Sequence, residues 1–151
     1  MNPPSTVEEI LDFAIAREQE AHDGYMELAR SVTRPWMWEV FEGFAQEEAG
    51  HKKKLVALKE GRRIAPPAGK ILDLKIGDYL VEVERSADLN YQQALIVAMK
   101  KEKAAFRLYT DLAAKVADAA VRATFLALAQ EEARHKLRFE IEYDDYILTE
   151  N

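Results

Sequence analysis

Apolar and small residues recur at alternating intervals of three and four along four stretches of the chain, the spacing of a helix face turned toward a core. Two stretches run through Val7, Leu11, Ala14, Glu18, Ala21, Tyr25, Leu28 and Val32, and through Tyr91, Leu95, Ala98, Glu102, Ala105, Tyr109, Leu112 and Val116. The other two run through Met37, Phe41, Phe44, Glu48, His51, Leu55 and Leu58, and through Val121, Phe125, Leu128, Glu132, His135 and Phe139. The pattern predicts an all-α protein with helices at about residues 6–31, 34–60, 88–115 and 119–146.

The four stretches form two copies of one unit, offset by 84 residues. The offset superposes Glu18 on Glu102, Tyr25 on Tyr109, the run 45–49 on the run 129–133, and His51 on His135. A repeat of this length covers a helix pair, so the sequence predicts one helical hairpin used twice.

The connection between the hairpins is expected to be long. Residues 61–87 lose the helical period, and Pro66, Pro67 and Gly69 interrupt any regular element there. A capping box of Ser5 and Glu8 is expected to open the first helix, and Ser86 or Asp88 the third. We therefore expect a single domain, residues 1–151, in which two tight hairpins are joined by a crossover into a four-helix bundle.

Acidic residues occupy core positions in all four predicted helices, which is unusual because a buried carboxylate costs several kcal/mol without compensation. The predicted seams carry no lysine or arginine that could neutralise four such groups. Two divalent cations would balance them, and histidine supplies the neutral nitrogen ligands that such metals favour. The predicted metal ligands are Glu18, Glu48, His51, Glu102, Glu132 and His135.

The Glu-x-x-His spacing puts Glu48 and His51 on adjoining turns of one helix face, angled toward the same cavity. We expect Glu48 and Glu132 to bridge two metals, while Glu18 and Glu102 each hold one.

Tyrosines follow two of the predicted ligands by seven residues, which is two helical turns. Tyr25 and Tyr109 are therefore catalytic candidates, each expected to donate a hydrogen bond to a ligating carboxylate of the other hairpin. Glu47 and Glu131 stand about 100° round the helix from the ligands and are expected to face solvent. The alternative is that they accept hydrogen bonds from the site.

Three further residues have no equivalent in the repeat. His22 aligns with Phe106 and is expected to be a surface or interhelical histidine, its role in the chemistry left open. Trp36 and Trp38 are expected to cover the core or to contact a second copy of the chain.

The composition of the chain limits the classes of partner and of metal site that we expect. The chain has 151 residues, a net charge of −6 and no cysteine, so nucleic acid is not an expected partner and thiolate metal sites are excluded. No apolar run of about 18 residues and no export signal is found, so we expect no membrane association and a cytoplasmic location.

With these motifs, residues 6–146 resemble the rubrerythrin branch of the ferritin-like superfamily. The resemblance implies a ferritin-like bundle with two iron ions, manganese or a mixed metal pair being the alternative. Two departures are evident. Rubrerythrins carry a cysteine-ligated rubredoxin domain, which a chain without cysteine cannot form, and an extra glutamate beside the third-helix ligand, where this chain has Ala105.

The resemblance implies reduction of hydrogen peroxide or dioxygen, with electrons from an external donor protein. Ferroxidase activity with iron handling, oxygenation of an organic substrate, and a structural or metal-sensing role are the alternatives. A homo-oligomer, with a dimer favoured, is also expected.

Overall fold

The computed structural model describes residues 6–62 and 90–150. They form α1 (Val7–Ser31), α2 (Pro35–Arg62), α3 (Tyr91–Lys115) and α4 (Ala119–Glu150). The predicted all-α four-helix bundle is confirmed, and α4 continues past its predicted end at residue 146. The predicted crossover, residues 61–87, lies outside the described residues except where α2 extends to Arg62.

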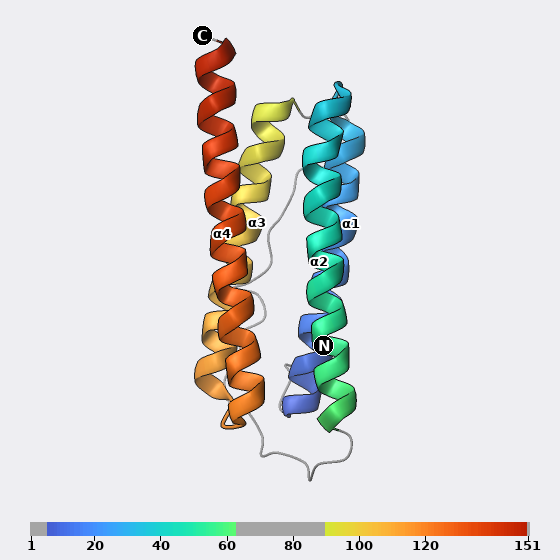
Figure 1. Cartoon of the computed structure of the whole chain (residues 1–151), viewed down its shortest axis with the longest axis vertical. Coiled ribbons are helices and arrows are strands. Elements are labelled where there is room, and N and C mark those ends of the chain that lie inside the picture. The colour runs from blue at the N-terminus through green and yellow to red at the C-terminus, as the bar shows by residue number, and fades with distance from the viewer. Residues whose placement is uncertain (1–5, 63–89, 151) are drawn as a thin grey trace.

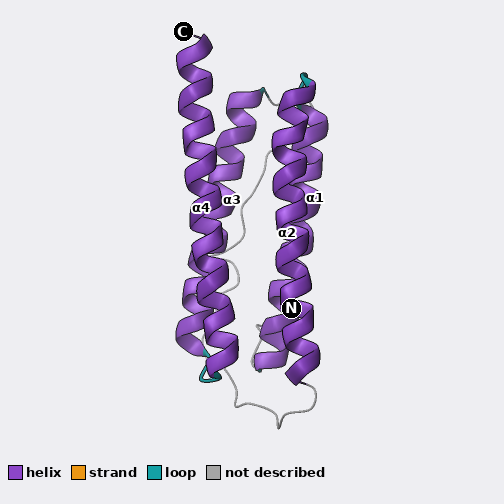
Figure 2. Cartoon of the chain, viewed as in Figure 1, coloured by secondary structure: helices purple, strands orange, loops and turns teal. Residues whose placement is uncertain are grey.

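The helices pair as two antiparallel hairpins, α1 with α2 and α3 with α4. In Figure 1, α2 ends at the lower end of the bundle, whereas α3 begins at the upper end. The order is therefore up, down, down, up, as two hairpins joined by a crossover require. Figure 2 shows the described chain as helix apart from short loops. In these parts of the chain, no helix combines the length and apolar character needed to cross a bilayer.

Short connections fix each hairpin. Pro35 occupies the first turn of α2, where its missing N–H costs no hydrogen bond, and the Trp38 Nε1 donates to the Val32 carbonyl at 2.6 Å. Before α4, the Asp118 carboxylate accepts from the Val121 N–H at 3.0 Å, as an N-cap does. Connections this short place consecutive helices side by side and antiparallel.

Two predicted N-terminal caps were wrong. Thr6, not Ser5, caps α1, accepting from the Glu9 N–H at 3.1 Å. The helix starts one residue later than the Ser5 cap implied, and its first residue, Val7, is buried.

The start of α3 is displaced further, from Ser86 or Asp88 to Tyr91. Asn90 accepts from the Gln93 N–H at 2.8 Å, and the Gln93 side chain accepts from the Asn90 N–H at 3.1 Å. This reciprocal capping box satisfies two backbone donors and allows the buried Tyr91 to begin the helix.

The apolar core is divided into two parts. The lower core includes Ile10, Leu11, Leu112, Phe125 and Leu128, and the upper core includes Leu28, Met37, Phe41, Leu95 and Phe139. In every helix, the buried polar residues lie between the residues of the lower core and those of the upper core. The bundle therefore consists of two hydrophobic halves separated by one polar layer.

We expect Phe125→Ala to lower the free energy of unfolding by about 3–5 kcal/mol, because it empties part of a tightly packed core. Phe125 is 0% exposed, whereas its neighbour Leu126 is 48% exposed. Leu126→Ala is therefore the matched control and should change stability by about 0.5 kcal/mol or less. Urea unfolding measures both, and equal losses would contradict the assignment of the core.

Candidate metal centre

The polar layer is formed by six buried side chains from all four helices. Glu18 comes from α1, Glu48 and His51 from α2, Glu102 from α3, and Glu132 and His135 from α4. Their exposed fractions are only 1–5%. The structure brings together all six residues that the sequence predicts as ligands.

The six side chains form two overlapping groups whose ligand atoms lie within 4.8 Å of one another. One group contains Glu18, Glu48, His51 and Glu132, and the other contains Glu48, Glu102, Glu132 and His135. Glu48 and Glu132 belong to both. This sharing is what a pair of bridging carboxylates requires.

Each tyrosine predicted beside the site donates its hydroxyl to a carboxylate of the other hairpin. Tyr109 donates to the Glu18 Oε1, and Tyr25 donates to the Glu102 Oε1. The remaining oxygen of each carboxylate, Oε2, is buried and has no hydrogen-bond partner. Each tyrosine therefore orients one carboxylate and leaves one of its oxygens available for a metal.

Both imidazole rings turn the same edge inward. The Nδ1 of His51 lies 2.8 Å from the Glu132 Oε1, and the Nδ1 of His135 lies 3.1 Å from the Glu48 Oε1. The two rings are nearly parallel, with 7° between their planes and 5.6 Å between their centres. Nδ1 is therefore the atom of each ring that could hold a metal.

The opposite edge of each ring meets a glutamate from the other hairpin. The Nε2 of His51 lies 2.5 Å from the Glu131 Oε2, and the Nε2 of His135 lies 3.1 Å from the Glu47 Oε2. Glu131 is 33% exposed and Glu47 is 43% exposed, so the expectation that they simply face solvent was incomplete. A carboxylate in this position fixes the ring and its tautomer when Nδ1 binds a metal.

These glutamates are held in turn by cations. The Lys54 Nζ lies 3.2 Å from the Glu131 Oε1, and the Arg138 Nη1 lies 3.0 Å from the Glu47 Oε2. Lys54 and Arg138 are themselves superposed by the offset of 84. This duplication of a cation is the sequence signal that could have identified both pairs.

Protons compensate the charge of the buried carboxylates in the absence of metal. Burial raises the pKa of Glu18 and of Glu132 well above the usual range, and nearby carboxylates raise both further. For Glu48, burial would also raise the pKa, but hydrogen bonds involving Glu18 and the two histidines lower it overall.

The pKa values of the two histidines shift in the direction opposite to the one that burial favours. Burial alone would lower their pKa, but hydrogen bonds and attraction to the carboxylates prevail. Glu18 and Glu48 raise the pKa of His51 to about 10, and Glu102 and Glu48 raise the pKa of His135 to about 9. The metal-free cage thus holds protons where a metal would place positive charge.

The donor set fits two divalent cations. Four buried atoms of the cage form no hydrogen bond of normal geometry: the Glu18 Oε2, the Glu102 Oε2, the Glu132 Oε1 and the His51 Nδ1. The last two lie 2.8 Å apart. Buried polar atoms are rarely left unpaired, and here they gather in one place. Oxygen and imidazole nitrogen are ligands that suit iron and manganese.

The other residues singled out in the sequence lie outside these groups. His22 is half-buried, and its Nδ1 lies 3.0 Å from the Asp23 Oδ1. Trp36 is exposed but packs edge-on against Tyr91, with 5.1 Å between ring centres. The interactions of Trp36 and Trp38 within the chain agree with a covering role at one end of the bundle.

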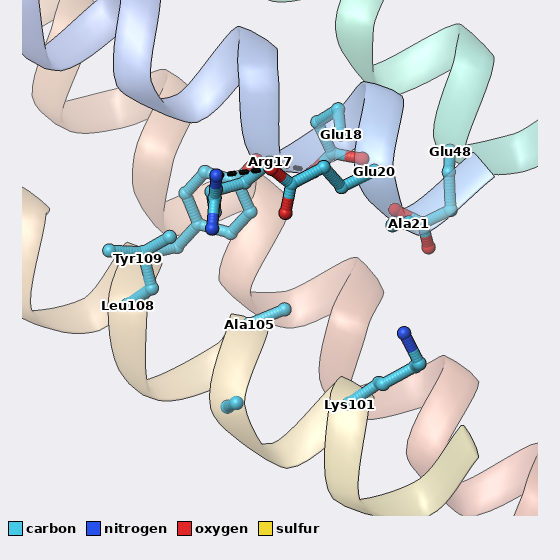
Figure 3. Close-up of a pocket in the computed structure, with 10 residues that line it drawn as sticks. Arg17, Glu18, Glu20, Ala21, Glu48, Lys101, Ala105, Leu108 and Tyr109 are labelled. Atoms are coloured by element: carbon cyan, nitrogen blue, oxygen red, sulfur yellow. Dashed lines mark hydrogen bonds and ion pairs between the residues drawn. The ribbon is translucent and has the colours of Figure 1, made fainter. Parts of the chain in front are cut away.

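A cavity of about 150 Å³ lies beside the cage, between α1 and α3. The carboxylates of Glu18 and Glu48 line its inner side, and the small side chains of Ala21 and Ala105 leave the space open. Figure 3 shows Arg17 and Lys101 on either side of Ala105. A small molecule could therefore reach the carboxylate cage from this side.

Comparison with known proteins identifies the family. A family model described as Rubrerythrin matches residues 9–143. The chain belongs to the rubrerythrin family. A rubrerythrin-family protein is expected to hold a di-iron site, and the buried Glu and His cluster could bind such a metal pair.

A solved structure of a hypothetical protein from Pyrococcus furiosus supports the fold. It shares 24% sequence identity with this rubrerythrin-family chain and has a TM-score of 0.65. The match covers 91% of this chain and 87% of the other. No protein of curated function matches significantly.

We expect the metal-free protein to lose stability as the pH rises from about 6.5 to 9.5. An unfolded histidine has a pKa near 6.5, so above that pH only the native state keeps these protons. The loss is up to about 1.4 kcal/mol per pH unit for each histidine, and the raised pKa values of Glu18 and Glu132 act in the same direction.

Urea unfolding at several pH values tests this expectation. The metal-loaded protein is the control, because metal replaces the protons and should remove this part of the slope. A metal-free protein whose stability is constant or rises across this range would contradict the proposed protonation.

We expect Glu131→Ala to weaken metal binding by about 10–100-fold, because His51 then loses the carboxylate that fixes its ring. Glu42→Ala is the control, since Glu42 is an exposed glutamate of the same bundle. Competition with a chromogenic chelator measures both affinities. Equal affinities in the two variants would show that Glu131 does not position His51.

Proposed function

We propose that this member of the rubrerythrin family is a non-haem di-iron redox protein that reduces hydrogen peroxide, or dioxygen, with electrons from an external donor. One observation carries the proposal: two groups of buried ligand atoms share Glu48 and Glu132. Shared carboxylates would keep two metals close enough for a small oxidant to meet both.

When bound, two ferrous ions supply the two electrons needed to cleave a peroxide O–O bond. The chain's own residues would hold the ions and orient the carboxylates around them. Tyr109 and Tyr25 stay protonated, because burial and the adjacent carboxylates raise the pKa of both hydroxyls well above the usual value. Each hydroxyl can therefore keep Glu18 or Glu102 in place, and each places a phenolic proton beside the centre.

Electrons are proposed to come from a separate protein. The chain contains no cysteine, so it cannot form the thiolate iron centre that would deliver them internally. A homo-oligomer, with a dimer favoured, remains part of the proposal. Exposed apolar side chains on α4, among them Leu137 and Ile141, provide a surface that could support it.

Oxidation of a small organic molecule is the second candidate function. The cavity between α1 and α3 favours it, because hydrogen peroxide needs no space of this size beside the carboxylates. Ferroxidase activity lacks a comparable observation among the described residues.

The test begins with metal counting in protein purified without added metal, followed by anaerobic reduction of the iron-loaded form and titration with peroxide. We expect two metals per chain. We also expect one peroxide to be consumed for every two ferrous ions, with absorption spectroscopy monitoring the oxidation of the iron. Glu48→Ala should lower the metal content, because Glu48 serves both groups.

Three results would redirect the proposal. Protein that binds no iron would leave a structural role. A diferrous form inert to peroxide would exclude peroxide reduction. Oxygen-dependent oxidation of many added ferrous ions per chain would favour iron handling.

A further inference from the structure

The cavity between α1 and α3 combines a small-residue wall with two cationic side chains. Ala21 lines it from α1, and Ala104 and Ala105 line it from α3. Arg17 and Lys101 also line it, together with Leu108, Tyr109 and the carboxylates of Glu18, Glu20 and Glu48. A cavity of about 150 Å³ has room for a benzene-sized group.

Lys101 is a half-buried cation without a close partner. Among the described residues, no carboxylate forms an ion pair with its ammonium, and Glu20 is instead paired with Arg17 at 2.5 Å. Glu20, Glu27 and Glu102 attract this ammonium from a distance, but none of them forms an ion pair with it. An anion in the cavity would give it a direct partner.

Gly24 makes room for this ammonium. A Cβ added at Gly24 would lie 2.9 Å from the Lys101 Nζ, closer than a carbon and a nitrogen can normally approach. The Lys101 side chain thus lies over the bare backbone of α1 rather than in solvent.

Arg17 supplies a second unsatisfied donor. Its Nε is buried and has no hydrogen-bond partner, although its Nη2 contacts Glu20. Figure 3 shows Arg17 beside Tyr109 and Lys101 farther along the same cavity. The lining therefore offers two donors for an anion and an apolar wall between them.

We propose that this cavity binds a small organic carboxylate of about the size of benzoate. Its carboxylate would be held by Lys101, and its apolar part would lie against the alanines in the direction of Glu18 and Arg17. The inference rests on the proposed metal centre, because Glu18 and Glu48 would repel an anion unless bound metals neutralise them.

The test is calorimetric titration of the zinc-loaded protein with benzoate, with zinc content measured in the same samples. Zinc is redox-inert, so the readout is binding and not turnover. We expect saturable binding that Lys101→Met weakens by about tenfold or more, as loss of a charge-assisted hydrogen bond implies. Lys103→Met, on the exposed side of α3, is the matched control and should leave the affinity unchanged.

Two further variants distinguish the contribution of the Lys101 charge to binding from that of the shape of the cavity. Gly24→Ala improves helix propensity but displaces the Lys101 ammonium, so it should weaken benzoate binding in a stable protein. Ala105→Leu fills the cavity and should abolish binding of benzoate and of neutral benzyl alcohol. Benzyl alcohol binding should be unaffected by Lys101→Met.

Zinc-loaded protein that does not bind benzoate, or equal affinities in Lys101→Met and Lys103→Met, would overturn the inference and leave the metal centre intact. If Lys101→Met does not fold, the Gly24→Ala result decides. Protein that takes up no zinc would refute the metal centre itself, and the inference would fall with it.

Discussion

The burial of four carboxylates in one layer is the constraint on which the rest of this structure depends. Each would be unstable in an apolar core unless its charge were cancelled or its proton retained. The bundle meets this requirement with two imidazoles, two tyrosine hydroxyls and the raised pKa values of Glu18 and Glu132. These arrangements leave several oxygen and nitrogen atoms unpaired, which is costly for a metal-free protein and suited to a metal-bound one.

The two apolar cores give this layer its rigidity. Packed aromatic and aliphatic side chains above and below the cage hold the four backbones at fixed separations. The polar side chains are therefore positioned by this packing and not by their own contacts alone. The tyrosines link the two features, because each ring belongs to the apolar packing and each hydroxyl reaches a carboxylate. Tyr25, for example, packs against Phe139 with 5.7 Å between ring centres while its hydroxyl contacts Glu102.

Much of this arrangement could be predicted from the sequence, because helix periodicity determines which residues share a face. Glu18 and Glu102 fall on the core stripe, and the internal repeat shows that this is not accidental. The contact between Glu131 and His51 could not be derived in the same way. It depends on how a long side chain one position off the stripe reaches across to the other hairpin, which only the docked geometry specifies.

The cavity was equally difficult to predict. Ala21 and Ala105 are compatible both with close helix packing and with an open space, because the distance between helices can adjust to their size. The start of α3 at Asn90 illustrates another limit. Several residues before Tyr91 could cap a helix, and the reciprocal contacts of Asn90 with Gln93 are what distinguish the one that does.

The exchange of partners between the hairpins has a consequence for biosynthesis. Tyr109 orients Glu18, and Glu131 meets His51, so the amino-terminal hairpin lacks part of its own metal environment. That hairpin leaves the ribosome first, before the residues that complete its cage have been made. A half-synthesised chain therefore cannot assemble the full centre, and capture of a reactive metal waits until translation has delivered both halves.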